Sequence, residues 1–179
     1  ENCWHLGASI KSPQWMEDFR ALTKNELGLP YVAKYKFDLP MIVSIGTAYS
    51  GIEDLVVAVD LRYFDYANTD GFGDHGYSPY GALNGLSWTN QFALATGLQY
   101  RMTDRLLLRA GYTFNTSPFG DADTFYNVAS LLDYQHQLGL GGSWELSQCV
   151  AFHVSYTHYF EWGSTGPIIL PTGVIPGSS

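Results

Sequence analysis

The side chains with the most obvious chemical potential in this sequence are five histidines and two cysteines. His5 and His153 each share a face of a predicted strand with a serine, Ser9 and Ser155, which is the beginning of a nucleophile and base pair. No carboxylate stands where it would orient either imidazole, so no catalytic triad is predicted. The cysteines form no CxxC or Cys/His ligand pattern. The sequence therefore favours a protein that is not an enzyme and that holds neither a metal ion nor a cofactor.

The charged side chains are more informative, because they are sorted between the two faces of the predicted strands. The face opposite the apolar one carries six of the nine basic residues but only four of the seventeen acids, and so has a charge of +2 (six minus four), while the whole chain has −8. A basic passage suits a carboxylate that leaves water. The residues expected to line such a passage are Arg62, Arg109, Arg101, Lys34, Lys36 and Asp60, with Arg62 and Arg109 as the strongest candidates. The alternative is that these charges pair with one another across strands and stabilise the sheet.

The elements that position these residues are predicted from hydrophobic alternation with a period of two, which is typical of β-strands. It recurs in seven segments, residues 4–11, 34–49, 55–64, 88–101, 106–115, 135–145 and 150–162. The apolar face of these segments contains no Asp, Glu, Lys or Arg, and the opposite face is rich in Gly, Ser, Gln and Ala. Alternating segments of about ten residues have the length that a tilted membrane-spanning strand needs.

Short and long connections alternate along the chain. Short turns are predicted at residues 51–54, 103–104 and 146–148, and long loops at residues 12–30, 68–87, 116–133 and 163–179. Outer-membrane barrels have brief periplasmic turns and extended outer loops, with aromatic residues at both rims of the apolar band. We therefore expect residues 1–179 to form part of an antiparallel transmembrane β-barrel, with the long loops on the outer side.

Composition excludes several other classes of protein. The chain has 179 residues, of which 46% are hydrophobic, yet the mean hydropathy is only −0.07. No apolar run approaches the length of roughly 18 to 20 residues that a membrane-spanning helix needs. The net charge of −8 argues against a nucleic-acid partner, because phosphate contacts need clusters of basic residues.

The loop over residues 12–30 contains a pattern that predicts a helix. Ser12 is a suitable N-cap, and Gly28 is a suitable terminator. Trp15, Phe19 and Leu22 then lie on one apolar face. Two interpretations remain open for this face: it captures hydrophobic substrates above the barrel, or it packs on the barrel rim.

The order of several short motifs resembles that of the FadL/TodX (OmpP1) family of outer-membrane transporters of long-chain fatty acids and hydrophobic compounds. The motifs are residues 91–100 (QFALATGLQY), 103–104 (TD), 107–112 (LLRAGY) and 115–118 (NTSP). The resemblance covers most of the chain between Trp4 and Trp162 and implies a barrel of about fourteen strands with an internal plug. This sequence has about seven of those strands and no plug segment, so it is expected to represent the C-terminal half of a family member.

The resemblance implies passive uptake of long-chain fatty acids or other hydrophobic compounds across the outer membrane of a Gram-negative bacterium. The expected partners are the lipid bilayer, hydrophobic small molecules, and further strands from the rest of the chain or from a partner subunit. An odd number of strands cannot close with antiparallel neighbours, which is why further strands are needed. The alternative function is that of a structural or interaction subunit of an outer-membrane assembly without transport activity.

Overall fold

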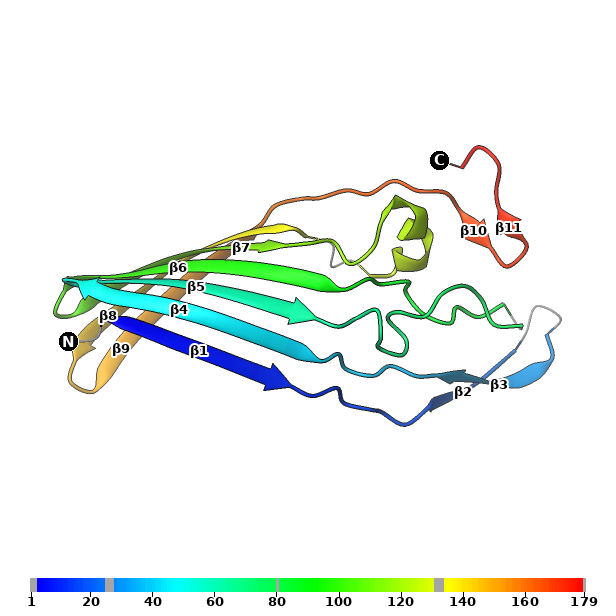
Figure 1. The fold of residues 1–179 in the computed structure, drawn as a ribbon, viewed down its shortest axis with the longest axis horizontal. Coiled ribbons are helices and arrows are strands. Elements are labelled where there is room, and N and C mark those ends of the chain that lie inside the picture. The colour runs from blue at the N-terminus through cyan, green and yellow to red at the C-terminus, as the bar shows by residue number, and fades with distance from the viewer. Residues whose placement is uncertain (1–2, 25–27, 80, 131–133, 179) are drawn as a thin grey trace.

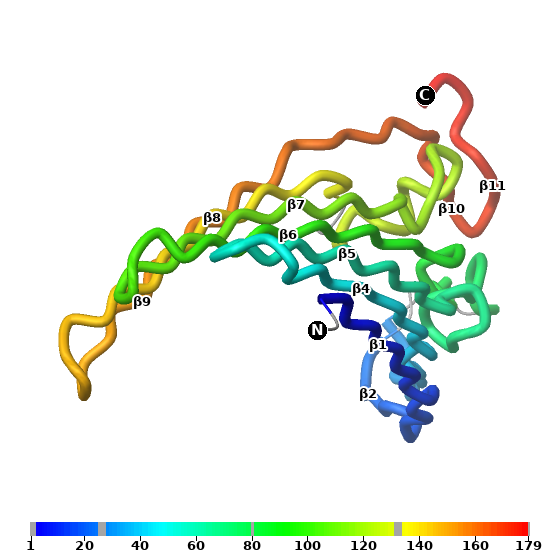
Figure 2. The backbone as a smooth tube through the Cα atoms, turned by 60° about the vertical axis from the view of Figure 1, so that its left-hand side comes forward, coloured from blue at the N-terminus to red at the C-terminus, as the bar shows by residue number. Residues whose placement is uncertain are grey.

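Seven long strands form one antiparallel sheet that dominates the protein (Figure 1). The structure is a computed structural model that describes residues 3–24, 28–79, 81–130 and 134–178. In sheet order the strands are β1 (Trp4–Lys11), β4 (Ile42–Ile52), β5 (Leu55–Phe64), β6 (Gln91–Thr103), β7 (Leu106–Asn115), β8 (His136–Ser147) and β9 (Val150–Tyr159). β1 and β9 lie at the two edges, so the sheet is open (Figure 2). The prediction of an all-β antiparallel fold that is part of a larger barrel is confirmed.

The sheet has two chemically distinct faces that continue across all seven strands. One face is formed by the odd-numbered residues of β1, β6, β7, β8 and β9 and by the even-numbered residues of β4 and β5. We call it the polar face, and we call the opposite one the apolar face. Residues that pair between neighbouring strands lie on the same face of the sheet. Asp60 lies opposite Gly46 and Ala95, and Arg109 lies opposite Gln99 and Gly141. A slip by one residue within the sheet would exchange the faces. The register shifts only beside the three short turns, between Tyr49 and Ile52, between Arg101 and Thr103, and between Glu145 and Ser147.

The two faces differ in burial as well. Burial alternates residue by residue over residues 91–100 of β6, with Ala93 on the polar face 7% exposed and the adjacent Leu94 on the apolar face 42% exposed. Every strand of the sheet exposes a large apolar side chain on the apolar face: Leu6, Ile45, Leu61, Leu94, Leu108, Leu140 and Val154. Among the described residues, the buried hydrophobic side chains are only Ala33, Ala93 and Phe119. An apolar surface of this extent requires a hydrocarbon environment.

Aromatic rings occupy both ends of the apolar band, as the sequence predicts. Trp4 packs on Tyr49 at the end of the sheet with short turns, with ring centroids 4.8 Å apart. Tyr63 packs on Phe92 near the opposite end, at 5.1 Å. Rings with a polar edge prefer the interface between hydrocarbon and water, so these contacts delimit the band that lies in the membrane. Within the described ranges, no helix is long and apolar enough to cross a bilayer.

All the short turns lie at one end of the sheet and all the long connections at the other (Figure 1). The short turns lie at residues 53–54, 104–105 and 148–149. Asp54 has a φ of 60° in the first of them, a left-handed conformation that Asp and Asn tolerate better than most residues. This one-sided distribution matches the predicted alternation of connections.

The prediction of a helix between residues 12 and 30 is wrong. The segment contains strand β2 (Phe19–Lys24), which pairs with β3 (Pro30–Tyr35) in a separate two-stranded hairpin. A single segment cannot reveal that its backbone hydrogen bonds are satisfied by a neighbour, and that partner decides for a strand here. The predicted strand over residues 34–49 is too long, because Lys34 belongs to β3 of the hairpin and β4 begins only at Ile42.

The remaining long connections are folded rather than extended. They contain the 3-10 helix η1 (Asp121–Asn127) and the small strands β10 (Ile169–Leu170) and β11 (Gly173–Val174). Asn127 is buried and joins two connections, since its Oδ1 accepts from Trp88 Nε1 at 2.7 Å and its Nδ2 donates to the Leu86 carbonyl at 2.9 Å. The Tyr77 hydroxyl donates to the Ile169 carbonyl, which ties the C-terminal segment to the connection between β5 and β6.

Candidate functional site

The polar face of β1, β4 and β5 lines an open cavity of about 620 Å³. Two of the predicted site residues, Asp60 and Arg62, lie in it on β5, together with His5, Ser9 and Lys11 of β1. Arg62 is the nearer of the two to the end with long connections, and Asp60 lies against Gly46 on the neighbouring strand. Residues predicted to share a passage are thus brought together on this part of the sheet.

Arg101 and Arg109 lie on the polar face of the adjoining strands. Arg101 pairs with Leu107 close to the short turn, and Arg109 follows on β7, opposite Gln99. Both arginines are exposed. They extend the basic surface from β5 across β6 and β7 toward the end with short turns.

Lys34 and Lys36 do not lie on the seven-stranded sheet. Lys34 belongs to β3, where it faces Arg20 of β2, and Lys36 lies between β3 and β4. The expectation that both line the passage depended on the overlong strand at residues 34–49. A strand over residues 34–49 would include Lys36 and Asp38. Instead, Lys36 pairs with Asp70 and Asp38 accepts from the Met16 N–H, and both partners lie in loops outside the sheet.

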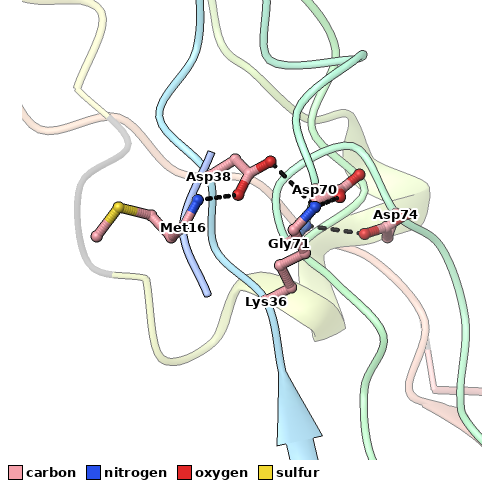
Figure 3. A network of polar contacts seen from close by, with 6 residues as sticks. All are labelled: Met16, Lys36, Asp38, Asp70, Gly71 and Asp74. Carbon is pink, nitrogen blue, oxygen red and sulfur yellow. Dashed lines mark hydrogen bonds and ion pairs between the residues drawn. The ribbon is translucent and has the colours of Figure 1, made fainter. Parts of the chain in front are cut away.

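Lys36 forms the centre of a polar network at the base of the hairpin (Figure 3). Its Nζ forms ion pairs with Asp38, at 3.3 Å, and with Asp70 of the following loop. Asp38 is buried and also accepts from the Met16 backbone N–H at 2.8 Å. The hydrogen bond to Asp70 raises the pKa of Lys36 above its usual value of 10.5. Desolvation opposes this to a smaller extent, and the hydrogen bond and charge of Asp38 add to the increase in the pKa. Lys36 therefore holds two loops together as a cation.

The two ion pairs of Lys36 are the salt bridges of the described residues. In this part of the chain, no carboxylate lies within 4.0 Å of the charged nitrogens of Arg62, Arg101 or Arg109. These three arginines therefore do not form the cross-strand ion pairs with acids that the alternative interpretation expects among the described residues.

The histidines of the polar face contact serines other than those expected from the sequence. His5 Nε2 lies 2.9 Å from Ser50 Oγ, and His153 Nδ1 lies 2.8 Å from Ser143 Oγ. Ser143 and Gln99 were not singled out in the sequence, although the alternation places both on the polar face. The missing signal is the register between strands, which sets which side chains meet.

Trp15, Phe19 and Leu22 do not share one face, as the predicted helix would have required. Trp15 lies before β2. Phe19 and Leu22 lie on opposite faces of β2, because they are three positions apart and the faces of a strand alternate. All three are exposed, Leu22 most of all at 89%. Leu22 pairs with Val32, and their face of the hairpin also carries Arg20, Lys24 and Lys34.

An aromatic cluster that sequence reasoning missed covers the end of the sheet with long connections. Tyr66, Phe72 and Trp88 contact one another with ring centroids 4.9 to 5.1 Å apart. Phe37 and Phe64 extend it. Burial raises the pKa of the Tyr66 hydroxyl. The cluster gives the loops an apolar core of their own.

An open antiparallel sheet with one hydrocarbon-facing side and one basic, polar side defines a segment of an outer-membrane β-barrel. The family described as outer membrane protein transport protein (OMPP1/FadL/TodX) matches residues 8–165, and the chain belongs to this family. The protein is therefore a component of the outer membrane of Gram-negative bacteria, and the family resemblance inferred from the sequence motifs is confirmed.

A solved structure supports the fold. The chain is similar to the TodX ΔS2S3 mutant, a monoaromatic hydrocarbon channel, with a TM-score of 0.57 and 16% sequence identity over 85% of this chain. The match covers 39% of the TodX chain, so the chain spans well under half the length of that channel. No curated protein sequence matches the chain significantly.

Proposed function

We propose that this chain forms part of a passive outer-membrane channel for hydrophobic compounds, and that the compounds include long-chain carboxylates such as fatty acids. The observation that carries the proposal is the set of polar-face arginines without carboxylate partners in the described residues. A channel for uncharged hydrocarbons has no need for such cations, whereas a carboxylate headgroup that leaves water gains charge-assisted hydrogen bonds from them. The TodX neighbour is a monoaromatic hydrocarbon channel, which supports the hydrophobic part of the proposed substrate.

The proposed path runs along the polar face, with Arg62 and Asp60 near the outer end and Arg109 and Arg101 nearer the short turns. The strands that complete the barrel come from the rest of the protein or from a partner subunit, because the edges of β1 and β9 would otherwise leave backbone groups without partners in hydrocarbon. These unpaired edges also favour one second candidate, a structural subunit of an outer-membrane assembly that has no transport of its own.

Uptake by liposomes tests the proposal and separates the two candidates. The full-length protein is reconstituted, and the entry of radiolabelled palmitate and of hexadecane is measured against protein-free vesicles. We expect both compounds to enter, and we expect Arg62→Ala to slow palmitate about fivefold to tenfold with little effect on hexadecane. Entry of neither compound through the wild type would favour the structural subunit. Equal slowing of both compounds would mean that Arg62 only shapes the barrel.

A further inference from the structure

Positive charge is concentrated in the hairpin of β2 and β3. The two strands contain Arg20, Lys24 and Lys34 and no acidic residue, although the chain has nine basic residues against seventeen acidic ones. All three cations lie on one face, because Lys24 is four positions from Arg20 and Lys34 is paired with Arg20. Leu22 and Val32 share that face. We call these five residues the basic face of the hairpin.

The basic face is the exposed side of the hairpin. Arg20, Lys24 and Lys34 are all exposed. On β3 the exposure alternates, so that Val32 is 50% exposed and the adjacent Ala33 only 4%. The face of Ala33 is therefore the one that packs against the protein, and the side chains of the basic face point away from it.

The described part of the chain provides no acidic partner for these three cations. None of its carboxylates lies within 4.0 Å of their charged nitrogens. Glu17 and Asp18 precede β2, and Glu26 lies outside the described residues. The positive charge of the basic face is thus not compensated by ion pairs within the residues that the structure describes.

Two of the cations stand directly opposite each other. Arg20 pairs with Lys34 between the two strands, and like charges directly opposite in an antiparallel pair are destabilising. A two-stranded hairpin is only marginally stable by itself, so this repulsion is a cost unless an anion lies between the two side chains. A phosphate suits this position, because its oxygens accept charge-assisted hydrogen bonds from a guanidinium and from an ammonium at once.

The hairpin lies where phosphate groups are abundant. It projects beyond β1 at the end of the sheet with the long connections (Figure 1), which is the outer side in outer-membrane barrels. The outer leaflet of this membrane consists mainly of lipopolysaccharide, whose headgroup carries phosphate groups. Basic segments beside an anionic lipid surface are attracted to it, and each Lys or Arg adds a gain of about fivefold in affinity.

We propose that the basic face of the hairpin binds the phosphorylated headgroups of lipopolysaccharide in the outer leaflet. One phosphate lies between Arg20 and Lys34, and Lys24 contacts a second one. Lys36 follows β3 directly, and its ion pair with Asp70 joins the hairpin to the next long connection, so the lipid holds the outer loops in place. The inference concerns the surroundings of the barrel and does not depend on which compounds cross it.

Chymotrypsin cleavage within residues 19–35 of the reconstituted full-length protein tests the proposal. The vesicles consist of phosphatidylcholine alone, or with lipopolysaccharide, or with lipopolysaccharide whose phosphates have been removed enzymatically. Lipopolysaccharide should slow the cleavage at Leu22 and Tyr31 about tenfold, since binding of several phosphates stabilises the folded hairpin. Dephosphorylated lipopolysaccharide and free inorganic phosphate should leave the cleavage rate unchanged.

Arg20→Gln separates lipid binding from a structural role of the arginine. It removes the like-charge pair, so the hairpin without lipopolysaccharide should be cleaved no faster than in the wild type, while the protection by lipopolysaccharide should fall about fivefold. Arg20→Lys keeps the charge and should keep most of the protection. Lys34→Gln is a second variant with the same expected result. Arg105→Gln, a charge-matched change in the short turn between β6 and β7, should leave the protection unchanged.

Four results would overturn the proposal. The first is a wild type that lipopolysaccharide does not protect, whether or not the protein admits palmitate or hexadecane. Equal protection by the dephosphorylated lipid would mean that its sugars shield the hairpin without binding to the cations. Equal slowing by soluble polyglutamate would assign the basic face to an acidic protein instead. Faster cleavage of Arg20→Gln without lipopolysaccharide, with full protection in its presence, would make Arg20 a structural residue only.

Discussion

At the scale of single residues, the glycines of the polar face divide into one that packing requires and several that it does not. Gly46 makes room for Asp60, whereas Gly97 has open space in front of it. Gly46→Ala should therefore lower the free energy of unfolding by roughly 1–3 kcal/mol through overpacking, as measured by urea unfolding in vesicles. Gly97→Ala should be neutral or slightly stabilising, by up to about 1 kcal/mol, because alanine loses less backbone entropy.

The cause of the Gly46 effect can be isolated with a double variant. Asp60→Ala removes the carboxylate that a Cβ at position 46 would meet, so Gly46→Ala should cost much less in that background. A full loss of stability in both backgrounds would show that the collision with Asp60 is not the reason for glycine at this position.

At the scale of elements, a few side-chain hydrogen bonds join the long connections to one another. Asn127 satisfies Trp88 Nε1 and the Leu86 carbonyl at once. Asn127→Ala should destabilise the two connections that Asn127 joins by roughly 1–3 kcal/mol, because two partly buried polar groups lose their partner. The expected result is faster proteolysis of the outer loops and a red shift of Trp88 fluorescence. Asn68→Ala removes an exposed bond to Asp65 and should change neither readout.

The strands were predictable from the sequence because alternation is a property of each segment alone. β5, β6, β7 and β9 occur close to where the alternation places them, and the face of Arg62 and Arg109 follows from the same periodicity. The hairpin of β2 and β3 was not predictable in this way. Its residues fit a helical face as well as a strand, and only pairing of Leu22 with Val32, across a connection, decides between them.

The contacts of the candidate site depended on a further variable that the sequence does not carry. Alternation fixes the face of a side chain, but the register between two strands can shift by two residues without changing any face. Arg109 meets Ser143 only in the register in which Arg109 lies opposite Gly141. The sequence could therefore nominate Arg109 as a cation of the passage, and it could not name its partners.

At the scale of the whole molecule, opposite charges are separated between the loops and the passage. Four of the seventeen acids were assigned to the passage in the sequence, and one of them, Asp38, lies in the loop network with Lys36 instead. Lys34 and Lys36 also lie off the sheet, so its polar face keeps Lys11, Arg62, Arg101 and Arg109 against Asp60 and Glu145, while the chain as a whole is acidic. Apart from the basic face of the hairpin, an acidic exterior with a basic passage favours capture of anions inside the barrel over adsorption to the loops.

The orientation of the sheet in the membrane is the last property that a pair of variants can test. Leu94 lies on the apolar face in the middle of the band, and the adjacent Ala95 lies on the polar face opposite Asp60. Leu94→Arg should cost roughly 2–4 kcal/mol in urea unfolding from vesicles, because it places a cation in hydrocarbon. Ala95→Arg places the same cation beside the Asp60 carboxylate and should cost far less. A tolerated Leu94→Arg together with a disruptive Ala95→Arg would mean that the polar face meets the lipid, and the passage along Arg62 and Arg109 would then be refuted.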